Sequence, residues 1–154
     1  MLMMKHRLQQ RQRRAYSSFL LFAVIIFAAC ANQPRYPAPA RNGADFVVEA
    51  ASLQLETPRF FTYQYNGKNI SFFVMRINTG VQSYLDACAS CYTHKQGYRY
   101  EDGAVTCRHC NMKFPVYKLE KGLGGCYPIK IEGKPVNGKY LIPVAVLEKA
   151  SDKF

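Results

Sequence analysis

The residues best suited to chemistry in this sequence are five cysteines between positions 88 and 126. They form two Cys-x2-Cys pairs and one single cysteine, with fifteen residues between the pairs and fifteen more before the last cysteine. The two spacer residues of each pair let both sulfurs of a tight turn face one centre, so that four thiolates can meet around a metal. The spacing predicts metal ligands at Cys88, Cys91, Cys107 and Cys110, and a further cofactor-binding thiol at Cys126.

The spacing leaves open which group these thiols hold. Four thiolates form a closed structural site around zinc, or a one-electron site around a single iron. They also hold an iron–sulfur cluster, in which a fifth cysteine replaces one ligand or tunes the potential from beside the cluster. A third alternative is a set of thiols and disulfides, although an odd number of cysteines cannot pair completely. Covalent haem is disfavoured, because Tyr92 and Asn111 follow the two pairs where haem attachment needs histidine.

Several other polar residues lie in or beside the cysteine stretch. His94 and His109 have donor nitrogens, but enough cysteines are present that we expect both to be exposed loop residues. We expect Asp86 to accept hydrogen bonds from the first turn rather than to bind metal. We expect the nearby tyrosines to pack, with their hydroxyl groups available for hydrogen bonds: Tyr84, Tyr92, Tyr98 and Tyr100.

The segments that position these cysteines predict a mostly β fold. Residues 46–55 and 60–65 have the β-branched and aromatic content of strands, and Asn66-Gly67 is a favoured two-residue hairpin turn before a return strand at 69–77. We expect a small antiparallel sheet of hairpins whose aromatic rings form the core. Residues 79–86 are expected to be a connector with a helical turn.

The cysteine stretch itself predicts a zinc-ribbon-like module with two knuckles. Glu101-Asp102-Gly103 indicates a hairpin that places Cys107 at a strand end, and residues 116–121 have room for one helical turn. Farther along, Asn137-Gly138 marks another turn, and Pro143 indicates that the strand before it is an edge strand or is interrupted. Little helix is expected apart from the N-terminal segment.

The first 29 residues have the pattern of an export signal. A basic stretch to Arg14 precedes eleven apolar residues, Phe19 to Ala29, which are too few to span a bilayer. The ending Phe27-Ala28-Ala29-Cys30 resembles a bacterial lipobox and predicts lipidation of Cys30; an ordinary cleavage site and an uncleaved anchor are the alternatives. The predicted parts are a signal peptide at 1–29, a lipidated N-terminus and Pro-rich tether at 30–43, and a cysteine-rich metal-binding domain at 44–154.

The net charge of +11 comes partly from this N-terminal segment, which carries five of the 21 Lys and Arg residues. The basic excess of the remaining chain is scattered and forms no cluster that would follow a phosphate backbone. We therefore expect no nucleic-acid binding. A solvated basic surface, or weak attraction to anionic lipid or to an acidic redox partner, is the better interpretation.

The residues around the cysteines also resemble a known family. The runs YNGKNISFFVMR, DACASCY, KQGYRYEDGAVTCRHCNMKFP and GGCYP are similar to those of the bacterial membrane iron–sulfur-containing, FtrD-like family, over a region from Pro58 to Lys149. All five cysteines match positions of that family's cysteine motif. The chain departs from the family pattern at Tyr127, where Asn is commoner, and in lacking the several membrane helices to which members are often fused.

This resemblance implies an electron carrier outside the cytoplasm. Family members are associated with ferrous iron uptake systems, alongside a periplasmic iron-binding protein, a cupredoxin-like protein and an iron permease. The implied role is to accept electrons when Fe2+ is oxidised for transport, on an iron–sulfur cluster or a single iron. We expect a lipid-anchored, periplasm-facing carrier on the bacterial cell envelope rather than an enzyme, with redox and iron-uptake proteins as partners. A structural zinc-ribbon interaction module and a thiol–disulfide redox protein are the alternatives.

Overall fold

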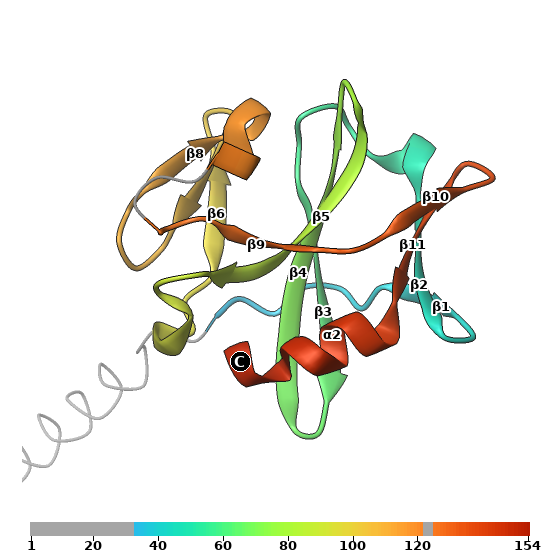
Figure 1. Ribbon diagram of the computed structural model, residues 1–154, viewed down its shortest axis with the longest axis horizontal. Helices are drawn as coiled ribbons and strands as arrows, with labels where there is room; N and C mark the ends of the chain where they lie inside the picture. Colours follow the sequence, from blue (N-terminus) through green and yellow to red (C-terminus); the bar gives the residue numbers. More distant parts are fainter. Residues whose placement is uncertain (1–32, 122–124) are drawn as a thin grey trace, which may run out of the picture. The chain divides into compact units, whose positions relative to one another are not determined.

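The computed structural model describes residues 33–121 and 125–154, so the predicted signal peptide and the predicted lipidation site at Cys30 lie outside the described residues. The described chain is mostly β, with three small antiparallel sheets, a short α-helix near the C-terminus and several turns of 3-10 helix (Figure 1). The predicted fold class is confirmed.

The central sheet holds the first knuckle. Its strands, in spatial order, are β3 (Arg59–Tyr65), β4 (Lys68–Ile77), β5 (Gly80–Cys88) and β9 (Pro128–Ile131). Asn66 and Gly67 join β3 to β4 and both have positive φ, as the two-residue hairpin turn requires. The sheet places Cys88 at the end of β5.

Strand β5 shows that the connector expected at 79–86 was wrong. The segment is a strand because its polar side chains find partners inside the fold. The hydroxyl of Ser83 donates a hydrogen bond to the carbonyl of Ile131 at 2.9 Å. The carboxyl of Asp86 accepts a hydrogen bond from the backbone N–H of Tyr98 at 2.6 Å. Such residues interrupt the apolar pattern in the sequence without interrupting the strand.

The second sheet contains β1 (Ala40–Asn42), β2 (Asp45–Glu49), β11 (Lys139–Pro143) and β10 (Lys134–Val136), in that order. Strand β2 stops short of Leu55 because the chain turns into a 3-10 helix, η1, at Ala50–Ser52. Strand β11 lies inside the sheet rather than at its edge, and it ends at Pro143 because proline has no N–H for the ladder. Helix α2 (Val144–Lys149) follows directly and continues into the 3-10 helix η4 (Ala150–Lys153), and neither was expected.

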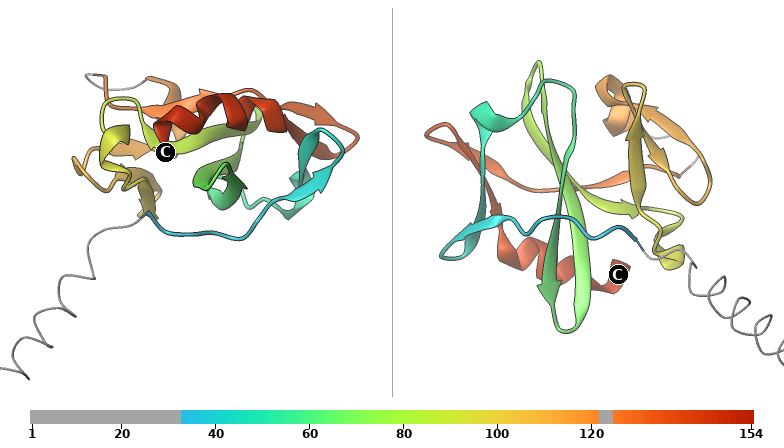
Figure 2. Two further views of the ribbon diagram at one scale, coloured as in Figure 1. Left: turned by 90° about the horizontal axis from the view of Figure 1, so that it is seen from below. Right: turned by 180° about the vertical axis from the view of Figure 1, so that it is seen from behind.

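The third sheet carries the second knuckle. Its strands are β6 (Tyr98–Glu101), β7 (Ala104–Cys107) and β8 (Lys113–Pro115). The predicted hairpin is confirmed, with Asp102 and Gly103 at positive φ and Cys107 at the end of β7. The predicted helical turn is a 3-10 helix, η3, at Val116–Lys121. Figures 1 and 2 show the third sheet on one side of the central sheet and the second sheet on the other.

Two hydrophobic clusters pack on opposite faces of β4. Phe72 lies in a cluster with residues of the second sheet and α2, whereas Phe73 lies in a cluster with Tyr98 of the third sheet. Neither phenylalanine has any solvent exposure, which confirms that the aromatic residues form the core. The cluster around Phe73 also contains Cys88 and Cys107. The core on this face of β4 is therefore also the floor of the cysteine site.

The described part of the Pro-rich segment lies against the central sheet. The backbone N–H of Tyr36 donates to Thr62 Oγ1 at 2.9 Å, and the N–H of Thr62 donates to the carbonyl of Pro37 at 3.2 Å. The ring of Tyr36 stacks on Phe60, with centroids 4.8 Å apart. The packed residues therefore extend upstream of Ala44, where the sequence places the start of the domain.

Candidate metal centre

Cys88 and Cys91 form the first knuckle, at the end of β5. The backbone N–H of Cys91 donates to the carbonyl of Cys88 at 3.2 Å, which closes the turn between them. A 3-10 helix, η2 (Tyr92–His94), follows and leads the chain away from the site. The two spacer residues thus place both sulfurs on one side of the turn, as the spacing predicts.

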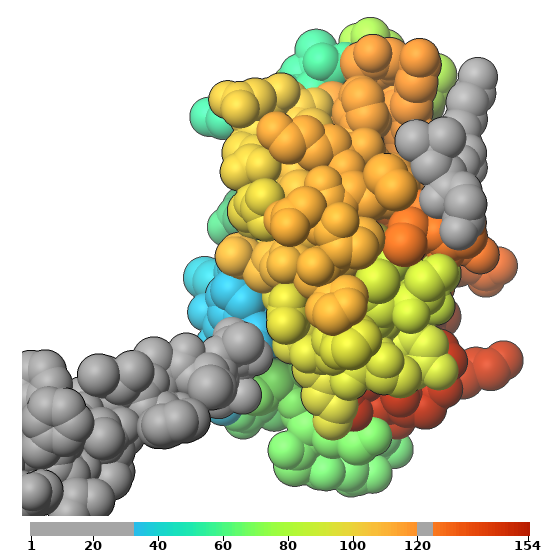
Figure 3. Space-filling model, turned by 90° about the vertical axis from the view of Figure 1, so that its left-hand side faces the viewer, coloured from blue at the N-terminus to red at the C-terminus, as the bar shows by residue number. Residues whose placement is uncertain are grey.

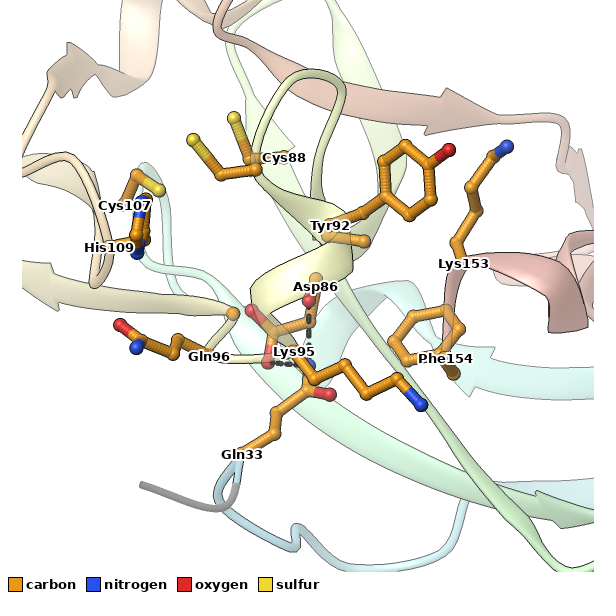
Figure 4. Close-up of a pocket in the computed structure, with 13 residues that line it drawn as sticks. Gln33, Asp86, Cys88, Tyr92, Lys95, Gln96, Cys107, His109, Lys153 and Phe154 are labelled. Carbon is orange, nitrogen blue, oxygen red and sulfur yellow. Dashed lines mark hydrogen bonds between the residues drawn. The ribbon is translucent and has the colours of Figure 1, made fainter. Parts of the chain in front are cut away.

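Cys107 and Cys110 form the second knuckle, after β7. The N–H of Asn111 donates to the carbonyl of Cys107 at 2.9 Å, and the N–H of Cys107 donates to the carbonyl of Met112 at 3.0 Å. Asn111 has a φ of 57°, a left-handed conformation that asparagine tolerates better than most residues, and it turns the chain back into β8. Figure 4 shows Cys88 and Cys107 entering the site from different strands.

Cys126 is held against the first knuckle by hydrogen bonds on either side of it. Ser90 Oγ donates to the carbonyl of Gly125 at 2.8 Å, and the N–H of Ala89 donates to the carbonyl of Tyr127 at 3.0 Å. Gly125 has a φ of 83°, and a Cβ at this position would lie 3.3 Å from Ser90 Oγ. The positive φ favours glycine at this position, and the Ser90 side chain leaves little room for a Cβ.

The structure brings all five predicted thiols together. Cys91 belongs to two groups of three sulfurs that lie within 4.8 Å of one another, one with Cys88 and Cys126 and the other with Cys107 and Cys110. The sulfurs of Cys110 and Cys126 are 3.8 Å apart. Sulfurs around one tetrahedral metal are also about 3.8 Å apart, since metal–sulfur bonds are about 2.3 Å long. The described thiols therefore form one continuous cluster around Cys91, and Cys126 is part of it.

This cluster lies near the surface of the domain. Cys88 and Cys107 are buried, Cys91 and Cys126 are half-buried, and Cys110 is exposed. Figure 3 views the molecule from this side and shows the knuckles and the third sheet forming most of the face. The inner thiols thus rest on the core, while the outer ones reach solvent.

Hydrogen bonds to sulfur favour the ionised form of two thiols. Burial raises the pKa of Cys88, but the neighbouring Tyr98 hydroxyl and the backbone N–H groups of the knuckle outweigh it and lower the pKa overall. Burial also raises the pKa of Cys110, but the backbone N–H of Met112 and the neighbouring thiols outweigh burial and lower the pKa overall. These two residues are therefore the first to become thiolates, which is the form that binds metal.

The other three thiols resist ionisation. Burial, and then the negative charge of Cys88, raise the pKa of Cys91. Burial raises the pKa of Cys107 to about 11, and burial together with Cys110 raises that of Cys126. Sulfurs this close cannot all be negative unless a cation neutralises them. The donor set is entirely thiol, which suits zinc, a single iron or an iron–sulfur cluster. The residues present therefore fit a metal centre.

Asp86 and Gln33 tie the supporting strands together beneath the cysteines (Figure 4). Besides its bond to the N–H of Tyr98, the Asp86 carboxyl accepts a hydrogen bond from Gln33 Nε2 at 2.9 Å, and Gln33 also donates to the Asp86 carbonyl at 2.6 Å. Gly97 has a φ of 65°, and a Cβ there would lie 2.6 Å from the Asp86 carboxyl. Asp86 accepts hydrogen bonds, as expected, but from Tyr98 and Gln33 rather than from the first turn. Gln33 was missed, because no local pattern marks a contact across 53 residues.

The stability of the protein will fall between pH 4 and pH 6 because of Asp86. Burial, partly offset by hydrogen bonds from Gln33 and Tyr98, raises the pKa of Asp86 from 3.8 to about 6. The folded state therefore keeps a proton that the unfolded state has lost. This contribution to stability is fully present below the unfolded pKa and is lost as pH rises through the folded pKa, by roughly 3 kcal/mol at most.

Urea unfolding of the wild type and of Asp86→Asn across this pH range measures the effect. Asparagine keeps an acceptor for the N–H of Tyr98 but does not titrate, and metal release affects both proteins. The unfolding free energy of the wild type relative to the variant should therefore decrease as pH rises from about 4 through 6 and stay constant above about pH 7. A difference that does not change with pH contradicts the assignment.

His94 and His109 are exposed, as expected, and neither belongs to the groups of thiols. Their rings stack, with centroids 3.5 Å apart and an interplanar angle of 10°. The contact joins η2, after the first knuckle, to the turn of the second knuckle. The sequence contains no pattern that predicts it, because the two residues meet only after both knuckles have formed.

Comparison with known proteins agrees with this geometry. The family model described as membrane iron-sulfur containing protein FtrD-like matches residues 53–154, a span that contains all five clustered cysteines. The chain belongs to the FtrD-like family. The match extends beyond the region from Pro58 to Lys149 in which the sequence resemblance was found. The comparisons with curated proteins and with solved structures found no match.

Membership of the FtrD-like family agrees with the chemistry of the site. The family is one of membrane iron–sulfur containing proteins, and the cluster of five thiols fits metal binding. Of the helices in residues 33–121 and 125–154, none is long and apolar enough to cross a membrane.

Proposed function

We propose that this FtrD-like protein is an electron carrier outside the cytoplasm that assists iron uptake. The observation that carries the proposal is the position of the thiols, which converge at the surface of the domain with Cys110 exposed. An iron–sulfur cluster or a single iron, when bound there, supplies a one-electron couple. A centre so close to the surface can exchange electrons with a docked protein, so the role of a carrier fits better than that of an enzyme.

The chain's own residues hold the centre and limit the access of water to it. The backbone N–H groups of the knuckles act to lower the pKa of Cys88 and Cys107, and the core around Phe73 closes the inner side of the site. The electron comes from the oxidation of one Fe2+ to Fe3+ during transport, and a one-electron acceptor in the membrane or the periplasm removes it. Redox and iron-uptake proteins are therefore the proposed partners.

The proposed carrier faces the periplasm and is anchored by a lipid on Cys30. This part of the proposal rests on the export pattern of residues 1–29 and on the small residues that precede Cys30. Labelling of bacteria that produce the protein with a fatty-acid analogue should mark the wild type and leave Cys30→Ser unmarked. Equal labelling of both proteins would exclude the anchor.

Metal and sulfide analysis of anaerobically purified protein tests the redox centre. We expect iron in stoichiometric amount, with acid-labile sulfide if the centre is a cluster, and visible absorption that bleaches on reduction. A paramagnetic resonance signal in one oxidation state would show that the centre carries one electron. Stoichiometric zinc without visible absorption would remove the redox role.

Two alternatives have support from particular observations. The closed turns of both knuckles also suit structural zinc, which would make the module an interaction domain whose folding depends on the metal. The separation of 3.8 Å between the sulfurs of Cys110 and Cys126 also suits a thiol–disulfide protein. Alkylation before and after reduction would then reveal two oxidation states of the cysteines in protein that contains no metal.

A further inference from the structure

Tyr98 lies between the two knuckles, and its backbone is fixed by groups next to each of them. Its N–H donates to Asp86, two residues before Cys88, and its carbonyl accepts a hydrogen bond from Arg108 Nε at 2.9 Å, one residue after Cys107. Tyr98 also pairs with Cys107 in the register of β6 and β7. The backbone of Tyr98 is therefore held in a fixed position relative to both Cys88 and Cys107.

The ring of Tyr98 is held equally firmly. It has no solvent exposure and lies edge-on between two other buried rings. Its centroid is 6.3 Å from that of Phe73, with an interplanar angle of 72°, and 6.3 Å from that of Phe114, with an angle of 77°. The direction of the hydroxyl group is thus determined by packing.

The Tyr98 hydroxyl is buried but does not reach hydrogen-bond geometry with any atom of the described residues. A hydroxyl buried in this way costs free energy unless it finds an acceptor. Cys88 is buried in the same cluster as Tyr98, and its sulfur lies close enough to the hydroxyl to interact with it. A phenol keeps its proton at neutral pH, so the hydroxyl is a donor.

We propose that Tyr98 is a positioning residue of the metal centre: its hydroxyl donates a hydrogen bond to the sulfur of Cys88 and thereby raises the reduction potential of the centre. The inference rests on the proposed function in taking Cys88 as a ligand. A hydrogen bond withdraws negative charge from a ligating sulfur and so stabilises the reduced form, which carries more negative charge. The bond also satisfies the only polar atom of this ring.

Tyr98→Phe tests the proposal, because it removes the hydroxyl and keeps the ring. The matched control is Tyr84→Phe, since Tyr84 is buried in the same cluster and its hydroxyl donates to Gln82 Oε1 at 2.5 Å. In anaerobically purified protein we expect Tyr98→Phe to lower the ratio of reduced to oxidised centre about tenfold at a fixed potential, which is about 59 mV for a one-electron couple. Tyr84→Phe should leave the ratio unchanged.

Cobalt substitution separates this inference from the proposed function. In Co2+-loaded protein, Tyr98→Phe should shift the thiolate-to-metal charge-transfer absorption to lower energy, and Tyr84→Phe should not. This result would support the hydrogen bond even in a zinc protein without redox activity. Equal absorption spectra, or equal potentials, for the wild type and Tyr98→Phe would overturn the inference.

A measurement on the unaltered protein applies if Tyr98→Phe does not fold. In protein loaded with 113Cd2+, magnetic resonance should detect a coupling between the Tyr98 hydroxyl proton and the metal, transmitted through the sulfur of Cys88. A hydroxyl proton that is observed but shows no such coupling would overturn the inference.

Discussion

Cys91→Ser will cost the protein more of its metal than any other single cysteine substitution. The sulfur of Cys91 belongs to both groups of three, with Cys88 and Cys126 in one and Cys107 and Cys110 in the other. A serine hydroxyl is a poor replacement for a soft thiolate, so this one substitution weakens both groups. We expect the metal affinity to fall by more than the roughly 10- to 100-fold that removal of a ligand's supporting partner causes.

Competition with a chelator in anaerobically purified protein measures this difference. Cys110→Ser and Cys126→Ser are the comparison variants, because each removes a sulfur that belongs to one group only. Thr93→Ala, at an exposed position in the adjacent η2 turn, should retain the wild-type affinity. If Cys110→Ser or Cys126→Ser releases metal as readily as Cys91→Ser, the shared position of Cys91 does not decide how the metal is held.

The knuckles could be predicted from the sequence because their geometry is local. A Cys-x2-Cys turn closes through a hydrogen bond between neighbouring residues, and the strand before Cys107 follows from the hairpin at Asp102 and Gly103. For Cys126, the sequence predicted that the residue belongs to the site but not where in the site it lies. Its contact with the first knuckle depends on hydrogen bonds from Ser90 and Ala89, and such bonds leave no periodic pattern in the sequence.

The errors in the predicted fold have a related cause. Strand β5 was missed because Ser83 and Asp86 look like loop residues until their partners on other strands are known. Pro143 was taken to indicate an edge strand or an interrupted one, whereas the strand that ends at Pro143 lies inside its sheet. A proline that ends a strand does not indicate whether that strand lies at the edge of a sheet. The supporting role of Gln33 depends wholly on tertiary packing, because its segment has no regular secondary structure before β1.

Phe72→Ala and Phe73→Ala will destabilise the domain to a similar degree, but only Phe73→Ala will change the metal centre. Both rings are fully buried at neighbouring positions of β4, and loss of a buried phenylalanine side chain costs about 3–5 kcal/mol. Phe72 stacks on Phe61, on the face of the sheet away from the cysteines. Phe73 stacks on Tyr84 and contacts the edge of Tyr98, in the cluster that contains Cys88.

Each of these variants is the control for the other. Urea unfolding measures the loss of stability, while the visible absorption and the chelator-competition affinity report on the centre. Phe73→Ala leaves a cavity beneath Cys88 and Tyr98, so it should weaken metal binding and alter the absorption at urea concentrations where the domain is still folded. Phe72→Ala should leave both unchanged in the folded protein. If metal affinity and absorption change equally in both variants, the centre responds to the stability of the whole domain. If they change in neither variant, the knuckles hold the metal without support from the core below them.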